Sequence, residues 1–206
     1  MGCRPSSPGL VHNSAGTRRL FFALQPDAEQ SAALVERVAP LVTHLGAQRV
    51  PAENIHATLC FVGAVAAEDV EKLASVAAAQ HAAHVSLRFD TLEFWEKPRV
   101  LCATSADAAS ASVKELADNL GRDAAAAGFH PDIKPFRPHL TLARKIPPVT
   151  AARCDWPQNF APPLLVRCDR FVLMESRRGE SGSIYSVVNS WPLYAEDTDS
   201  LSANIQ

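Results

Sequence analysis

The stretch Asn54-Ile55-His56-Ala57-Thr58-Leu59 contains the pattern His-x-Thr-Leu, and Arg137-Pro138-His139-Leu140-Thr141-Leu142 repeats it. Both copies lie in runs of residues that favour strands. Successive side chains of a strand point to opposite faces, so each histidine shares a face with the threonine two positions later. The repeat therefore predicts two motif strands, one in each half of the chain, that face each other across a cleft.

Two imidazoles and two hydroxyls in one cleft would suit the chemistry of a phosphate ester. One imidazole can accept a proton while the other donates one, and the hydroxyls can bind phosphoryl oxygens. We therefore expect His56 and His139 to be catalytic, and Thr58 and Thr141 to bind phosphate. The two motifs are chemically equivalent, so the residues themselves leave open which histidine is the acid.

Hydrophobic periodicity outside the motifs predicts alternating strands and helices. Strands are expected near residues 19–24, 55–62, 85–94, 99–104, 139–144, 165–175 and 183–190, and helices near 28–45, 67–83 and 108–127. Gly128 is expected to end the third helix. The proline-rich residues 147–163 are expected to form a loop, and residues 178–183 a hairpin connection.

This order of elements predicts an α+β protein with two pseudo-symmetric lobes of mainly antiparallel sheet, with outer helices, around a central cleft. The 206 residues are enough for one such domain, which we place at residues 18–194. Residues 1–17 are rich in Ser, Gly and Pro and are expected to be a disordered tail. Residues 195–206 are expected to be a flexible C-terminal tail.

Composition is that of a soluble globular protein, with 47% hydrophobic and 20% charged residues. A net charge of −2 argues against a protein that coats long nucleic acid, but it is compatible with recognition of one RNA end. Residues 134–145 carry four basic and no acidic side chains around the second motif. This basic edge is either simply solvated or attracts an anionic substrate.

The five cysteines form no Cys-x-x-Cys pair, which indicates a reduced chain in the cytoplasm. No apolar run approaches the roughly 18 residues of a transmembrane helix, so no association with a membrane is expected. We also expect no metal or other cofactor. No feature implies a protein partner, and we expect a monomer.

Several segments together resemble one family. They are Arg18–Leu24, Val50–Gly63, Phe136–Arg144, Phe171–Arg177, Tyr185 and Trp191–Leu193. The chain resembles the RNA 2',3'-cyclic phosphodiesterases, or 2'-5' RNA ligase-like proteins, of the two-histidine phosphoesterase superfamily over about residues 18–194. It departs from the family pattern at Cys60, where a lysine is expected, and at Gln48-Arg49, where Arg-Trp is frequent.

The resemblance implies hydrolysis of a 2',3'-cyclic phosphate at an RNA end to a 2'-phosphomonoester, with O3' as the leaving group. It implies that His56 donates the proton and His139 accepts one, and that Arg144, Phe61 and Tyr185 are candidate substrate contacts. The same groups would serve reversible 2'-5' RNA ligation. Two alternatives stay open, namely a phosphodiesterase for small cyclic nucleotides and a non-catalytic module that binds RNA ends.

Strand parity raises a question at one residue near each motif. Cys60 would share a face with His56 and Thr58, so it either lines the cleft or packs in the core. Arg144 follows His139 by an odd number of residues, which in a regular strand points its side chain away from the cleft. Arg144 would reach the cleft only if the strand twists or bulges between the two residues.

Overall fold

Two antiparallel sheets form the body of the protein in a computed structural model, which describes residues 16–105, 111–179 and 182–194. The four-stranded sheet has the order β3 (Ala57–Ala66), β1 (Thr17–Leu24), β8 (Arg170–Arg178), β9 (Ser183–Pro192). The five-stranded sheet has the order β2 (Gln48–Arg49), β6 (His139–Arg144), β5 (Val100–Thr104), β4 (Val85–Trp95), β7 (Gln158–Cys168). The predicted α+β class with mainly antiparallel sheets is confirmed, and each sheet contains one motif strand.

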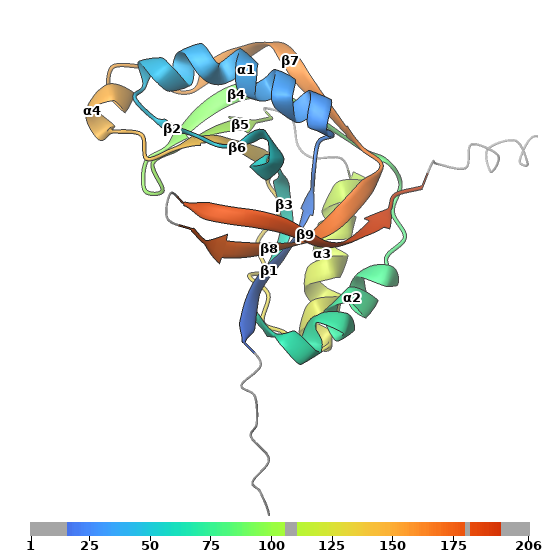
Figure 1. Cartoon of the computed structure of the whole chain (residues 1–206). Helices are drawn as coiled ribbons and strands as arrows, with labels where there is room; N and C mark the ends of the chain where they lie inside the picture. Colours follow the sequence, from blue (N-terminus) through green and yellow to red (C-terminus); the bar gives the residue numbers. More distant parts are fainter. Residues whose placement is uncertain (1–15, 106–110, 180–181, 195–206) are drawn as a thin grey trace, which may run out of the picture.

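Helices cover the outer faces of the two sheets (Figure 1). The helix α1 (Ala28–His44) contacts β2 and β6 of the five-stranded sheet, and α3 (Ala111–Ala126) contacts β3 of the other. The shorter α2 (Val70–Ala78) packs against α3. A single-turn helix α4 (Pro148–Ala151) and two 3-10 turns, η1 (Ala52–Asn54) and η2 (Ala67–Asp69), complete the regular structure.

Local sequence explains where α1 and α3 begin or end. Asp27 caps α1, because its carboxylate accepts a hydrogen bond of 2.7 Å from the amide of Gln30. Gly128 follows α3 with a φ of 90°, which a residue with a Cβ adopts only with strain. The amide of Phe129 then bonds the carbonyl of Ala124, closing the helix as expected for a C-terminal glycine.

The core lies between the helices and the sheets, and β1 is buried on both faces. Leu20, Phe22 and Leu24 point into the main hydrophobic cluster, while Phe21 and Ala23 belong to a small cluster on the opposite face of the sheet. This burial explains why β1 is a continuous apolar run rather than an alternating one. The small cluster forms an apolar floor on the inner face of the four-stranded sheet.

The two lobes do not correspond to the two halves of the chain. The four-stranded sheet joins β1 and β3 with β8 and β9, whereas the five-stranded sheet takes β2 and β4 to β7. The single strand expected at 165–175 is divided at Asp169, with β7 in one sheet and β8 in the other. Asp169 and Arg170 are both exposed, and two successive polar residues inside an apolar run were the available signal for this break.

The expected loop at 147–163 is wrong in part, because it contains α4 and the first half of β7. β7 is an edge strand that pairs only with β4, and the pairing shifts register between Phe89 and Thr91. Pro162 and Pro163 lie at this irregularity. Proline lacks an amide donor and is tolerated at such edge positions, so the prolines did not exclude a strand.

Other boundaries differ modestly from those expected. The helix expected at 67–83 begins as η2 and ends at Ala78, and the short strand β2 was not expected. Thr17, assigned to the tail, begins β1. Residues 1–15, 106–110, 180–181 and 195–206 lie outside the described residues. They include nearly all of the two expected tails, the first three residues of the helix expected at 108–127 and the middle of the hairpin connection expected at 178–183.

Candidate active site

A β-bulge in β6 brings Arg144 to the cleft. The pairing of β6 with β5 skips Leu142, so Leu142 and Ala143 are both buried and the alternation of the strand is reset. Arg144 therefore returns to the face that carries His139 and Thr141. Arg144 follows His139 by five residues, so in a regular strand the two side chains would lie on opposite faces. The bulge is what places them on the same face.

The first motif strand contains the same irregularity. The pairing of β3 with β1 skips Leu59, so Leu59 and Cys60 both face the core and Phe61 returns to the face of His56. Cys60 Sγ lies 3.7 Å from the position that a Cβ on Gly121 of α3 would occupy. Of the two interpretations of Cys60, core packing is correct, and burial raises the pKa of its thiol to about 11.

The two histidine rings are held in the same way. His56 Nδ1 lies 2.7 Å from the carbonyl oxygen of Asn54, and His139 Nδ1 lies 2.9 Å from that of Arg137. A carbonyl can only accept, so in each ring Nδ1 is the protonated donor. Each neutral ring therefore leaves its Nε2 lone pair unused by this contact and available to a substrate.

The surroundings of both rings disfavour the imidazolium form. Burial lowers the pKa of His56 to about 4, outweighing the hydrogen bond to Asn54, and the charges of Arg144 and His139 lower it further. Burial also lowers the pKa of His139, against the effect of its hydrogen bond to Arg137. The two motif strands meet where the sheets meet, because β3 contacts β6 there.

The first motif borders a cavity of about 260 Å³. Its lining consists of Arg19, Phe21, His56, Thr58, Phe61, Arg144, Ser176, Ser183 and Tyr185. The rings of Phe21 and Tyr185 each lie 5.0 Å from the His56 ring, and Arg144 Nη2 donates to Tyr185 Oη at 3.3 Å. The three candidate substrate contacts are thus brought together beside the first motif.

Sequence reasoning missed four residues of this lining, namely Arg19, Phe21, Ser176 and Ser183. The signal for Arg19 was its alternation with Phe21 on β1, and its guanidinium lies 4.8 Å from the centre of the Phe61 ring. The two serines come from β8 and β9, and their place depends on the pairing of β8 with β1 and of β9 with β8. That pairing joins distant parts of the chain and left no local signal.

The second motif has polar surroundings of its own. Trp95 of β4 lies against His139 with the ring centres 4.7 Å apart, and the Thr141 hydroxyl lies 4.0 Å from Cys102 Sγ of β5. The carboxylate of Glu93 accepts hydrogen bonds from both Trp95 and Arg137. His139 therefore has a carboxylate in its neighbourhood, whereas the ring contacts of His56 are aromatic.

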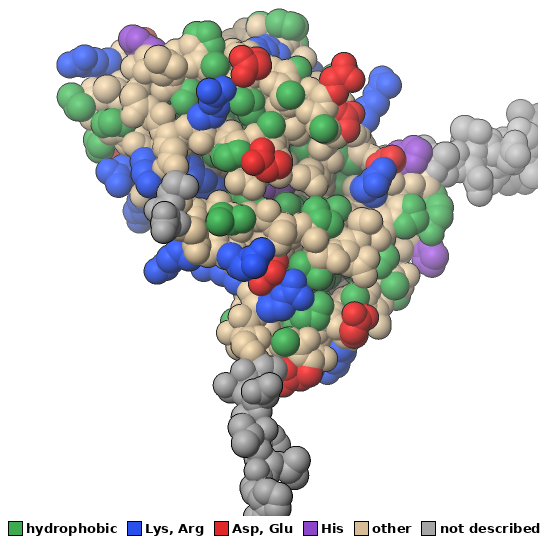
Figure 2. Space-filling view, viewed as in Figure 1, with side chains coloured by type: hydrophobic (Ala, Val, Ile, Leu, Met, Phe, Trp, Pro, Cys, Tyr) green, Lys and Arg blue, Asp and Glu red, His purple; other side chains and the backbone are tan. Residues whose placement is uncertain are grey.

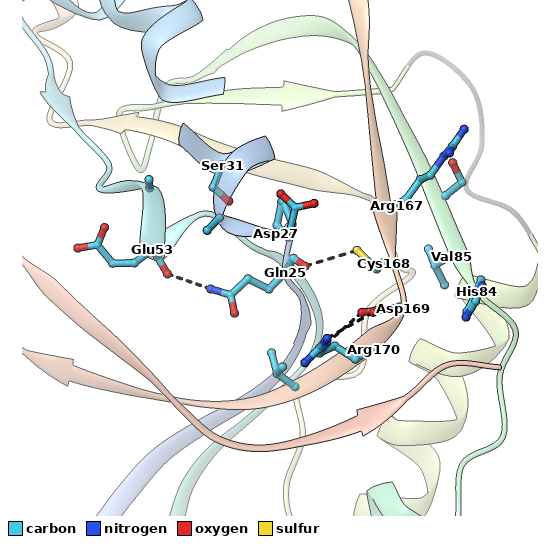
Figure 3. Close-up of a pocket in the computed structure, with 15 residues that line it drawn as sticks. Gln25, Asp27, Ser31, Glu53, His84, Val85, Arg167, Cys168, Asp169 and Arg170 are labelled. Carbon is cyan, nitrogen blue, oxygen red and sulfur yellow. Dashed lines mark hydrogen bonds and ion pairs between the residues drawn. The ribbon is translucent and has the colours of Figure 1, made fainter. Parts of the chain in front are cut away.

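A larger cavity of about 890 Å³ lies away from both motifs, between the start of α1, η1 and the link from β7 to β8 (Figure 3). Several of its polar groups bind one another. Gln25 donates to the carbonyl of Glu53 at 3.0 Å, and Arg170 pairs with Asp169. None of the four motif residues lines it, whereas His56 and Thr58 line the smaller cavity; His139 and Thr141 line neither of the two.

Two negative findings hold for the residues that the structure describes. Within 16–105, 111–179 and 182–194, His, Cys, Asp and Glu side chains form no group of three or more that could hold a metal ion. The helices in these ranges are too short or too polar to span a bilayer.

The sequence of residues 26–180 matches the model of the 2'-5' RNA ligase superfamily. The chain belongs to this superfamily. The family resemblance inferred from the sequence is thereby confirmed.

Individual relatives agree with this assignment. The chain is 31% identical to RNA 2',3'-cyclic phosphodiesterase of Escherichia coli over 127 residues, which are 62% of this chain and 72% of that protein. It is 29% identical to RNA 2',3'-cyclic phosphodiesterase of Thermus thermophilus over 198 residues, covering 86% of this chain and 91% of that protein. The crystal structure of E. coli LigT in apo form is 27% identical, with a TM-score of 0.74 over 87% of this chain and 99% of that one.

Proposed function

We propose that this protein hydrolyses the 2',3'-cyclic phosphate at an RNA end to a 2'-phosphomonoester, using His56 and His139 as an acid–base pair. The proposal rests on one observation: both histidine rings are held by the same hydrogen bond, in which Nδ1–H donates to the backbone carbonyl two residues earlier. Binding a phosphate would not require two imidazoles held this way, because hydroxyls and arginines suffice. Proton transfer does require them.

The reaction requires two proton transfers, one from the attacking water and one to the leaving oxygen O3'. The imidazole acting as base removes a proton from water, and the water oxygen forms a bond to phosphorus as the bond from phosphorus to O3' breaks. The imidazolium acting as acid protonates O3', which leaves as a hydroxyl group. Following the family resemblance, His56 is the acid and His139 the base. The same steps with a 5'-hydroxyl in place of water would form a 2'-5' linkage, with O3' again leaving as a hydroxyl group.

The remaining groups stabilise charge on the phosphoryl oxygens. Hydroxyls of Thr58 and Thr141 lie on the motif faces and can donate to the non-bridging oxygens, which gain charge in the transition state. Arg144 lies in the same cavity as Thr58 and supplies a positive charge beside His56. This charge holds down the pKa of His56 in the free protein, and a bound phosphate dianion or monoanion would offset it.

A basic rim favours RNA over a small cyclic nucleotide. Lys and Arg side chains gather on both sides of the β8–β9 tip (Figure 2). Arg177 and Arg178 are exposed on β8, and Arg49 and Lys145 are exposed at the facing ends of β2 and β6. Such a rim suits the phosphates of nucleotides that precede the reacting end. The LigT relative has also been crystallised with 3'-AMP, which supports a nucleotide ligand for this fold.

The proposal is tested by a hydrolysis assay with product analysis. An oligoribonucleotide ending in a 2',3'-cyclic phosphate should be converted to a 2'-phosphate, with a higher kcat/KM than the cyclic mononucleotide with the same base. Phosphorus NMR distinguishes the 2'-phosphate from the 3'-phosphate. Equal kcat/KM for the two substrates would favour the small-nucleotide alternative, and binding of the oligonucleotide without turnover would favour the non-catalytic module.

The lowered histidine pKa values predict an acidic optimum for kcat/KM. The active form has one protonated and one neutral ring, and in the free protein this form is most populated between two pKa values that both lie below the usual 6.5. The rate should fall on the acid side as the base protonates, and on the alkaline side as the acid loses its proton.

The optimum of kcat should lie at higher pH than that of kcat/KM, because the anionic substrate raises the pKa of a bound imidazolium. Initial rates from pH 4 to 10 at saturating and at low substrate separate the two profiles. The limbs belong to the coupled pair rather than to either ring. A kcat/KM that rises steadily to pH 10 would indicate hydroxide attack without a general acid and would contradict the paired mechanism.

A further inference from the structure

Glu93 of β4 is the centre of a hydrogen-bond network behind His139. Its Oε1 accepts from Thr104 at 3.0 Å and from Arg137 at 2.6 Å, and its Oε2 accepts from Trp95 at 2.8 Å and from Arg137 at 2.8 Å. Thr104 is fully buried, so its bond fixes the carboxylate to the body of the sheet. The hydrogen bonds outweigh partial burial and lower the pKa of Glu93, which keeps it charged.

Two of the three hydrogen-bond partners of Glu93, Trp95 and Arg137, contact His139. Trp95 lies against the His139 ring at 4.7 Å between centres, and the Arg137 carbonyl accepts the His139 Nδ1–H at 2.9 Å. The Arg137 guanidinium also lies 5.5 Å from the centre of the Trp95 ring. One carboxylate therefore holds the ring that packs on the imidazole and the residue whose carbonyl orients it.

We propose that Glu93 is a positioning residue for the reaction, acting on His139 through Trp95 and Arg137; this inference rests on the proposed function. Among the residues that the structure describes, no carboxylate holds the ring contacts of His56 in this way, because His56 packs against Phe21 and Tyr185. The network also balances charge at His139. The charged groups that act on its ring are Arg137, which lowers its pKa, and Glu93, which raises it.

The test compares Glu93→Gln with Glu96→Gln in the full-length protein. Glutamine keeps the shape of Glu93, but it removes the charge and turns one acceptor into a donor that Trp95 or Arg137 cannot satisfy. We expect kcat to fall about 10- to 100-fold with little change in KM, since small displacements of a catalytic group cost about that much. Glu96 is exposed in the β4–β5 turn, so the same substitution there should leave kcat and KM unchanged.

A merely structural role is distinguished by titration and by a double-mutant cycle. In Glu93→Gln, NMR titration should show the pKa of His139 displaced downward while that of His56 stays the same, because Arg137 then acts unopposed. Arg137→Gln should lower kcat less in the Glu93→Gln background than in the wild type, since the two residues act as a unit. The thermal midpoint of each variant shows whether it is folded at the assay temperature.

The outcomes separate the two proposals. If wild-type protein hydrolyses no cyclic phosphate, the proposed function fails. The NMR titration still tests whether Glu93 affects the pKa of His139. If the wild type is active and folded Glu93→Gln keeps its full kcat, or if the titration of His139 is unchanged, the positioning role is overturned. An equal loss of kcat in Glu96→Gln would show a general effect of removing a negative charge, and it would also overturn the positioning role of Glu93.

Discussion

His56→Ala and His139→Ala should each lower the turnover of a 2',3'-cyclic phosphate by about 10²- to 10⁴-fold, the usual range for loss of one proton-transfer group. In the proposed reaction the two rings move different protons, so neither can replace the other. The double variant should therefore be little slower than the slower single variant, because a pair that acts as a unit shows strongly non-additive losses. Initial rates with a cyclic-phosphate oligonucleotide measure all three.

Folding should survive both substitutions. Each ring is only partly buried and makes one hydrogen bond to a nearby carbonyl, so removing it leaves the sheets intact. His130→Ala is the matched control, because His130 is exposed beyond α3 and should keep full activity. Near-normal turnover by a folded His56→Ala or His139→Ala protein would remove that residue from the mechanism.

Local patterns predicted the elements whose signals lie within a few residues. The apolar run of β1, the capped amphipathic α1 and the alternation in β4 were expected at nearly the bounds that the structure has. The motif strand at 139–144 was expected with its observed bounds. In these cases periodicity and capping agree with the tertiary structure, so neighbouring residues alone sufficed.

The sheet that a strand joins was not predictable in the same way. β7 and β8 are separated by one residue yet belong to different sheets, and this choice depends on pairing with β4 and with β1. The same dependence hid Ser176 and Ser183 from the expected site. Only pairing between distant segments brings these side chains to His56.

The bulges are the most instructive failure of local reasoning. Parity along a regular strand placed Cys60 with the motif and excluded Arg144, and one extra residue in each strand reverses both results. Phe61 and Arg144 hold the same position relative to their histidines, so the two copies of the motif share the bulge as well as the sequence. The sequence signal for the bulge was a repeated pair of apolar residues directly after His-x-Thr, namely Leu59-Cys60 and Leu142-Ala143. Both residues of each pair are buried.

Thr58→Val and Thr141→Val should each lower kcat by about 10²- to 10³-fold, the cost of removing one donor to a developing oxyanion. Valine preserves the branched shape and the strand preference of threonine, so the variants should fold normally. In the proposed mechanism the hydroxyl stabilises charge that grows in the transition state, so KM should change much less than kcat. Rate measurements over a range of oligonucleotide concentrations separate the two constants.

The matched controls are Thr58→Ser and Thr141→Ser, which keep a hydroxyl on the motif face and should retain most of kcat. Thr141 has a further contact, because its hydroxyl lies 4.0 Å from the Cys102 thiol, whose pKa is raised by burial to about 12. A thiol that stays protonated can donate to the Thr141 oxygen, which leaves the hydroxyl proton for the phosphate. Serine variants as slow as the valine variants would show that the methyl group matters, and valine variants with normal kcat would remove the hydroxyls from transition-state stabilisation.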